Sequence, residues 1–122
     1  MSSGVSATAQ PSGEVTAEDQ RRINRFARLH DAFVSAKTQI RQLENTISNH
    51  SEAMDELLLL DDDDAQQDEV TARLEKLKAE AEGKLEELRA AQTERDGEMR
   101  ELKRLLYAKF GDNINLEADP DD

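Results

Sequence analysis

The sequence has no cysteine and no tryptophan, and aromatic residues make up only 3% of its 122 residues. Without cysteine the chain can form neither a disulfide framework nor a cysteine-ligated metal site, which fits a reducing compartment, the cytoplasm or the nucleus. The two prolines lie near the ends and leave the middle free for uninterrupted helix. Because 36% of the residues are charged, the chain lacks the material for a globular core, and its apolar residues must be arranged along a line.

Long apolar runs and a surplus of basic residues are missing too. No segment approaches the ~20 apolar residues of a membrane span, and the N-terminal stretch resembles no secretory signal, so we expect a soluble protein that does not bind membranes. The net charge of −12 disfavours general binding to nucleic acid. The sequence has no glycine-rich phosphate loop, no nucleophile–base pair and no cluster of metal ligands. We therefore expect no catalysis, no cofactor and no metal.

A heptad pattern runs through residues 17–60. Two series of mostly apolar residues recur at intervals of seven, the second three residues behind the first. They are Phe26, Phe33, Ile40, Ile47 and Met54, and Leu29, Ala36, Leu43, His50 and Leu57. Taken as a and d positions, they predict a coiled-coil helix of five heptads. His50 has no second metal ligand on its face, so we interpret it either as a polar seam residue that helps to fix the register or as a partly solvated residue near the elbow.

A second heptad pattern covers residues 66–110. Its seam positions are Val70, Leu74, Leu77, Ala81, Leu85, Leu88, Gln92, Arg95, Met99, Leu102 and Leu106. The spacing alternates between four and three except from Leu77 to Leu85, where two intervals of four follow each other. Such a stutter locally unwinds a left-handed supercoil. Together with Gly83 and Gly97, it predicts a loose, bendable middle for this helix.

Capping signals mark the ends of both patterns. Thr16-Ala-Glu-Asp19 is a candidate N-cap, in which the Thr16 hydroxyl covers an unpaired amide and the acidic side chains face the positive end of the helix. Gly111 is suited to the positive φ that often follows a helix. Between the patterns, residues 61–65 form an acidic elbow. Its four consecutive aspartates repel one another, and Asp64 is placed to cap the second helix. A calcium loop would need interleaved ligands and a glycine, which this stretch lacks.

The predicted fold is therefore all-α: a long antiparallel two-helix coiled-coil hairpin, with a disordered arm over residues 1–16 and an acidic tail over residues 111–122. Antiparallel pairing brings the start of the first helix beside the end of the second. This tip holds more large apolar groups than the a and d positions of a two-helix seam can bury. Two alternatives are open: Phe110, Ile114 and Leu116 fold back and close the tip, or the tip stays exposed and binds another polypeptide.

Residues 18–29 and 106–119 resemble the first and last segments of β-type subunits of the prefoldin family. The resemblance implies a co-chaperone without ATP or catalysis, in which six subunits project coiled coils from a β-barrel body. Their tips hold unfolded actin or tubulin for transfer to a chaperonin. By this resemblance the residues expected to contact unfolded clients are Ile23, Phe26, Ala27, Leu29, Leu106, Tyr107, Phe110, Ile114 and Leu116.

The middle of the chain departs from that family pattern. The resemblance implies a β-hairpin between the helices, which joins the barrel holding the hexamer together, but no strand pattern lies between Leu60 and Val70. Divergence, altered splicing and a gene-model error would each produce this loss, which bears directly on assembly with the other prefoldin subunits. The competing hypothesis is a structural coiled-coil module that homodimerises, for example into a four-helix bundle, or pairs with another coiled coil.

Overall fold

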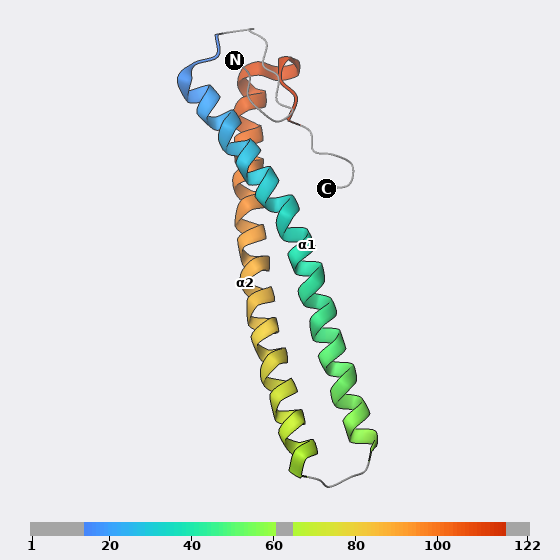
Figure 1. The fold of residues 1–122 in the computed structure, drawn as a ribbon. Coiled ribbons are helices and arrows are strands. Elements are labelled where there is room, and N and C mark those ends of the chain that lie inside the picture. The colour runs from blue at the N-terminus through green and yellow to red at the C-terminus, as the bar shows by residue number, and fades with distance from the viewer. Residues whose placement is uncertain (1–13, 61–64, 117–122) are drawn as a thin grey trace. The chain divides into compact units, whose positions relative to one another are not determined.

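The computed structural model describes residues 14–60 and 65–116. Its elements are α1 (Ala17–Leu59), α2 (Ala65–Phe110) and the short 3₁₀ helix η1 (Gly111–Asn113), and no β-strand occurs among the described residues. The two long helices pack against each other (Figure 1), which confirms the predicted all-α coiled-coil hairpin. The elbow aspartates, with the predicted cap at Asp64, lie outside the described residues.

Hydrogen bonds at Thr16 begin α1. The Asp19 amide donates to Thr16 Oγ1 at 3.1 Å, and the Thr16 amide donates to Asp19 Oδ2 at 3.0 Å. These two bonds satisfy two donors that a helix start otherwise leaves without partners. They confirm the predicted N-cap at Thr16 and show that Asp19 completes it as a reciprocal capping box. At the other end, α2 stops at Gly111, whose φ of 57° is the left-handed value expected of a residue just past a helix.

The chain divides into two compact units. The first comprises residues 14–35 and 92–116 of the described chain, and the second comprises residues 36–60 and 65–91. Each unit pairs a segment of α1 with a segment of α2. The first unit has the larger buried core, which is described below as a candidate site.

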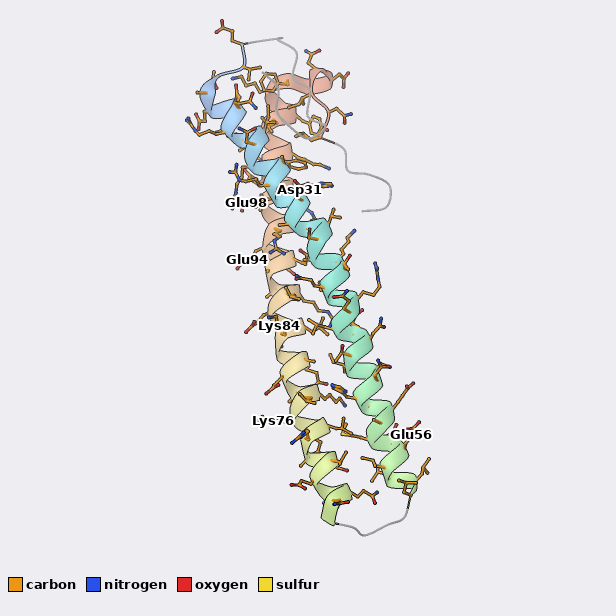
Figure 2. All side chains as sticks on the ribbon, in the orientation of Figure 1. Asp31, Glu56, Lys76, Lys84, Glu94 and Glu98 are labelled. Atoms are coloured by element: carbon orange, nitrogen blue, oxygen red, sulfur yellow. The ribbon has the colours of Figure 1, made fainter. Side chains whose placement is uncertain are left out.

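The second unit is held by a narrow seam. Its buried apolar residues are Ala36, Ala81 and Leu85, while most other seam positions are half-buried. Arg89 donates a hydrogen bond to Glu44 across the seam at 2.6 Å, and both side chains are about half exposed, so the pair adds little stability. Charged side chains such as Glu56 and Lys76 project from the outer sides of the two helices (Figure 2).

The register of α2 corrects the predicted stutter. Val70 and Leu77 are 48% and 42% exposed, whereas Thr71 and Lys78 are half-buried in the seam. With Thr71 and Lys78 as seam positions, the intervals of four and three alternate without interruption through Leu85. A regular register therefore prevails over burial of two apolar side chains, because the aliphatic stem of a lysine can line a seam while its ammonium group reaches water.

Four large apolar side chains near the ends of the helices in this unit are not covered. Leu58, Leu59 and Leu60 are 77%, 83% and 63% exposed, and Val70 lies nearby in the sequence of α2. Leu58 and Leu59 belong to the last turn of α1, where the Leu60 amide donates to the Leu57 carbonyl at 3.2 Å. Exposed apolar groups gathered in this way are typical of surfaces that contact another polypeptide.

Candidate functional site

The first unit contains a cluster of buried apolar side chains, here called the tip cluster. Its α1 members recur every three residues, and its α2 members recur every four, so each set lies along one face of its helix. Half-buried Met99 and Tyr107 pack against it. The buried members are Ile23, Phe26, Leu29, Leu102, Leu106, Phe110, Ile114 and Leu116.

Residues 111–116, here called the strap, contribute the last two members of the cluster. Gly111 turns the chain after α2, and Ile114 is extended, with φ −132° and ψ 146°. Ile114 and Leu116 are 4% and 2% exposed, while Asn115 between them is exposed. The Leu116 amide donates to Tyr107 Oη at 2.8 Å. The strap thus returns to α2 and covers apolar groups that the two helices alone leave uncovered.

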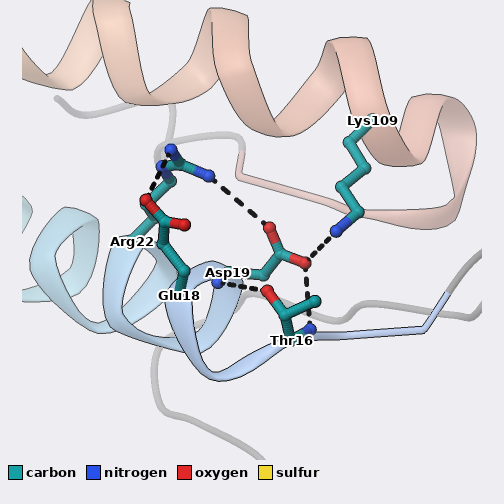
Figure 3. Close-up of polar contacts among 5 residues, drawn as sticks. All are labelled: Thr16, Glu18, Asp19, Arg22 and Lys109. Atoms are coloured by element: carbon teal, nitrogen blue, oxygen red, sulfur yellow. Dashed lines mark hydrogen bonds and ion pairs between the residues drawn. The ribbon is translucent and has the colours of Figure 1, made fainter.

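A buried carboxylate joins the two helices beside the cluster (Figure 3). Asp19 is 1% exposed and pairs with Lys109, which comes from the last turn of α2. Arg22 Nη1 lies 3.6 Å from Asp19 Oδ1. Burial by itself would raise the pKa of Asp19, but the hydrogen bonds from Lys109 and Thr16 outweigh it and lower the pKa below its ordinary value. The ionised carboxylate therefore fastens the start of α1 to the end of α2.

Polar contacts continue along the same pair of segments. Arg25 donates two hydrogen bonds to Glu98, at 2.7 and 2.9 Å, and this contact lowers the pKa of Glu98 and raises that of Arg25. Gln92 Nε2 donates to the Phe33 carbonyl at 2.9 Å. The seam position Gln92 is therefore satisfied by the opposite helix, so a polar residue is tolerated there.

The structure brings the nine predicted client-contact residues together in the first unit. Seven of them are buried in the tip cluster, and the other two, Ala27 and Tyr107, are half-buried. Ile114 and Leu116 fold back over the tip and are buried together with Phe110, the last residue of α2. This is the first of the two alternatives that the sequence left open.

Four residues of this region were not among those nine. Leu102 and Met99 were recognisable as heptad positions, and Asp19 was recognisable as a cap. Only the partnership of Asp19 with Lys109, 90 residues away, left no signal in the sequence.

The described residues contain no group of three or more histidine, aspartate or glutamate side chains placed to hold a metal ion. Among those same residues, no helix combines the length and the apolar character that crossing a membrane requires. At the tip cluster the structure shows apolar contact between the two helices and the strap, with the Tyr107 hydroxyl accepting a hydrogen bond from a main-chain amide.

Comparisons with known proteins agree with one another. Residues 20–113 match the family described as Prefoldin subunit. The chain is 36% identical to "Probable prefoldin subunit 4" of Caenorhabditis elegans, over 87% of this chain and 95% of that protein. It is 32% identical to "Prefoldin subunit 4" of Homo sapiens, over 98% of both chains, and 37% identical to that of Saccharomyces cerevisiae, over 85% of this chain and 90% of the yeast protein. No solved structure matches the chain.

The alignment with the human protein also reveals a difference in length. It spans 132 positions, whereas this chain has 122 residues, so at least ten positions have no counterpart here. Because the alignment takes in 98% of both chains, the missing positions are internal.

The family match covers most of the chain, and the relatives, from animals and a fungus, are aligned over nearly their whole length. The chain belongs to the prefoldin subunit family, and its general role is that of a prefoldin-type co-chaperone.

Proposed function

We propose that the tip cluster of this co-chaperone subunit binds unfolded polypeptides of the actin and tubulin kind and passes them to a chaperonin. Binding is reversible apolar contact, without ATP and without covalent chemistry. The contacting residues are Ile23, Phe26, Ala27, Leu29, Leu106, Tyr107, Phe110, Ile114 and Leu116. We assign this activity to the cytoplasm, with the nucleus as a second compartment.

One observation supports this proposal above the others: the tip cluster is larger than a two-helix seam requires. A seam needs only a and d residues, yet here Phe110, Ile114 and Leu116 add apolar surface beyond it. Ile114 and Leu116 belong to the six-residue strap, which covers the apolar faces of the two helices and is held in part by the main-chain hydrogen bond from Leu116 to Tyr107. A large apolar surface beneath a short cover is suited to exchanging one apolar partner for another.

The half-buried side chains at the rim provide a test that leaves the buried core intact. Ala27 and Leu105 are half-buried and adjoin the cluster members Phe26 and Leu106 in the sequence. We expect the double variant Ala27→Glu, Leu105→Glu, which adds two carboxylates at these positions, to lose most suppression of aggregation. The control is Ala72→Glu, Leu77→Glu, which adds the same charge to exposed positions of the second unit. The assay is light scattering of chemically denatured actin diluted into buffer without nucleotide, with helicity checked by circular dichroism. Equal suppression by both variants would refute the proposal.

We further propose that the exposed Leu58, Leu59 and Leu60 contact other prefoldin subunits in a hetero-oligomer. Their exposure supports this assignment, because an apolar surface of this kind is stabilised by association. The same exposure favours the alternative, a coiled-coil module that pairs with a second copy of itself. Native mass spectrometry of the chain alone and mixed with the other five prefoldin subunits distinguishes the two: a six-subunit complex supports assembly, and a homodimer that persists in the mixture supports the alternative.

A further inference from the structure

The strap shows what kind of segment the tip cluster accepts. In an extended chain, side chains two residues apart lie on the same side, whereas in a helix neighbours on one face are three or four residues apart. Ile114 and Leu116 are buried, Asn115 between them is exposed, and the backbone at Ile114 is extended. The cluster therefore holds two aliphatic side chains at the spacing of an extended segment.

The hydrogen bond from the strap is independent of side-chain identity. The donor is the main-chain amide of Leu116, and the acceptor is Tyr107 Oη at 2.8 Å. Apart from proline, every residue of an unfolded chain carries such an amide. Tyr107 can thus accept from many sequences, while the buried cluster selects for aliphatic side chains.

We propose that the tip cluster recognises extended segments with two aliphatic side chains two residues apart, and that the strap is the internal occupant that such a segment displaces. This inference rests on the proposed function and specifies the client chemistry. An unfolded polypeptide supplies extended segments of this pattern, whereas a folded amphipathic helix presents its apolar groups at a different spacing. Client capture then exchanges Ile114 and Leu116 for equivalent side chains of the client. The inference thus narrows the nine proposed contact residues to the seven on α1 and α2, with Ile114 and Leu116 as their internal competitors.

Labelled peptides provide the direct test. One probe is a 12-residue glycine- and serine-rich peptide that contains isoleucine and leucine two residues apart, and its control has the same composition with these residues three apart. The receptors are the wild-type chain and the strap variant Ile114→Ser, Leu116→Ser. Because the strap occupies the site in the wild type, we expect the variant to bind the first probe about tenfold more tightly than the wild type does. Within the variant, we expect the first probe to bind more tightly than the control.

Hydrogen exchange on the unmodified protein keeps the test valid if the strap variant fails to fold. We expect the Leu116 amide to be protected in the free chain and to lose protection when the first probe is in excess, with little effect from the control peptide. Equal binding of the two peptides, or an unchanged Leu116 amide at saturating probe, would overturn the proposal.

The outcomes separate this inference from the proposed function. Suppression of actin aggregation without displacement of the strap leaves client binding standing and removes the recognition rule. Displacement of the strap by the peptide without suppression of aggregation leaves the recognition rule standing and removes the proposed client binding.

Discussion

The carboxylate of Asp19 offers the sharpest test of how the first unit is held together. It accepts a hydrogen bond from the Thr16 amide as part of the helix cap, and it pairs with Lys109 from the end of α2. Substitution Asp19→Asn keeps an oxygen that can accept from Thr16 and removes the charge. Substitution Asp19→Ala removes both contacts. The pair of variants therefore separates the cap from the ionic contact.

The expected cost follows from burial. Asp19 is 1% exposed, but the Lys109 side chain is 39% exposed, so water screens part of the attraction. We expect Asp19→Asn to lower the free energy of unfolding by about 1–2 kcal/mol. Loss of the capping acceptor adds about 1 kcal/mol, so we expect about 2–3 kcal/mol for Asp19→Ala.

The pH dependence gives a second, independent readout. Because the folded state lowers the pKa of Asp19, the ionised carboxylate contributes its full stabilisation above the unfolded pKa of about 3.8. That contribution is lost as the pH falls through the folded pKa. The difference in unfolding free energy between wild type and Asp19→Asn should therefore stay constant from pH 7 to about pH 5 and shrink at lower pH.

Urea unfolding followed by circular dichroism measures these differences. A double-mutant cycle with Lys109→Met isolates the interaction between the two side chains, and residues in direct contact are expected to couple by at least about 0.5 kcal/mol. Additive effects of the two substitutions would contradict the assigned ion pair. An Asp19→Asn difference that persists unchanged to pH 3 would contradict the lowered pKa.

Two further predictions concern α2 and the glycine that follows it. Gly83→Ala and Gly97→Ala should each stabilise the chain by about 1 kcal/mol in urea unfolding, because an added Cβ meets nothing within 4 Å at either position. Gly111→Ala should destabilise the chain by about 1–2 kcal/mol, because φ at this residue is 57°. The register of the second unit predicts that Leu77→Gln changes stability by less than about 0.5 kcal/mol, while Leu85→Ala, at a buried position, costs about 2–5 kcal/mol. A loss of several kcal/mol for Leu77→Gln would show that Leu77 is a seam residue and that α2 contains the stutter after all.

Much of the fold follows from local patterns in the sequence. The seven-residue spacing of apolar groups predicts both long helices, because a helix places residues three and four apart on one face. The capping box at Thr16 and the glycine at 111 mark helix ends, since each acts through its own backbone neighbours. The excess of apolar residues at the start of the first helix and the end of the second also identifies the region where the tip cluster forms.

The seam positions of α2 depended on competition between two registers along the paired helices. Val70 and Leu77 are apolar, as seam residues usually are. The register that α2 keeps through Leu85 nevertheless places Thr71 and Lys78 in the seam instead. Composition alone could not decide this, because two alternative registers bury similar numbers of side chains over one or two turns. The choice is made over the whole length of the paired segment.

The sequence by itself determined that this protein is a pair of long helices with apolar ends, because helical periodicity and capping are properties of neighbouring residues. Only the tertiary structure decided that the strap closes over the tip cluster and that Asp19 pairs with Lys109. Both contacts involve the chain beyond one helix: the strap requires the backbone to turn at Gly111, and the ion pair joins residues 90 positions apart. Their formation depends on the burial available once α1 and α2 have paired.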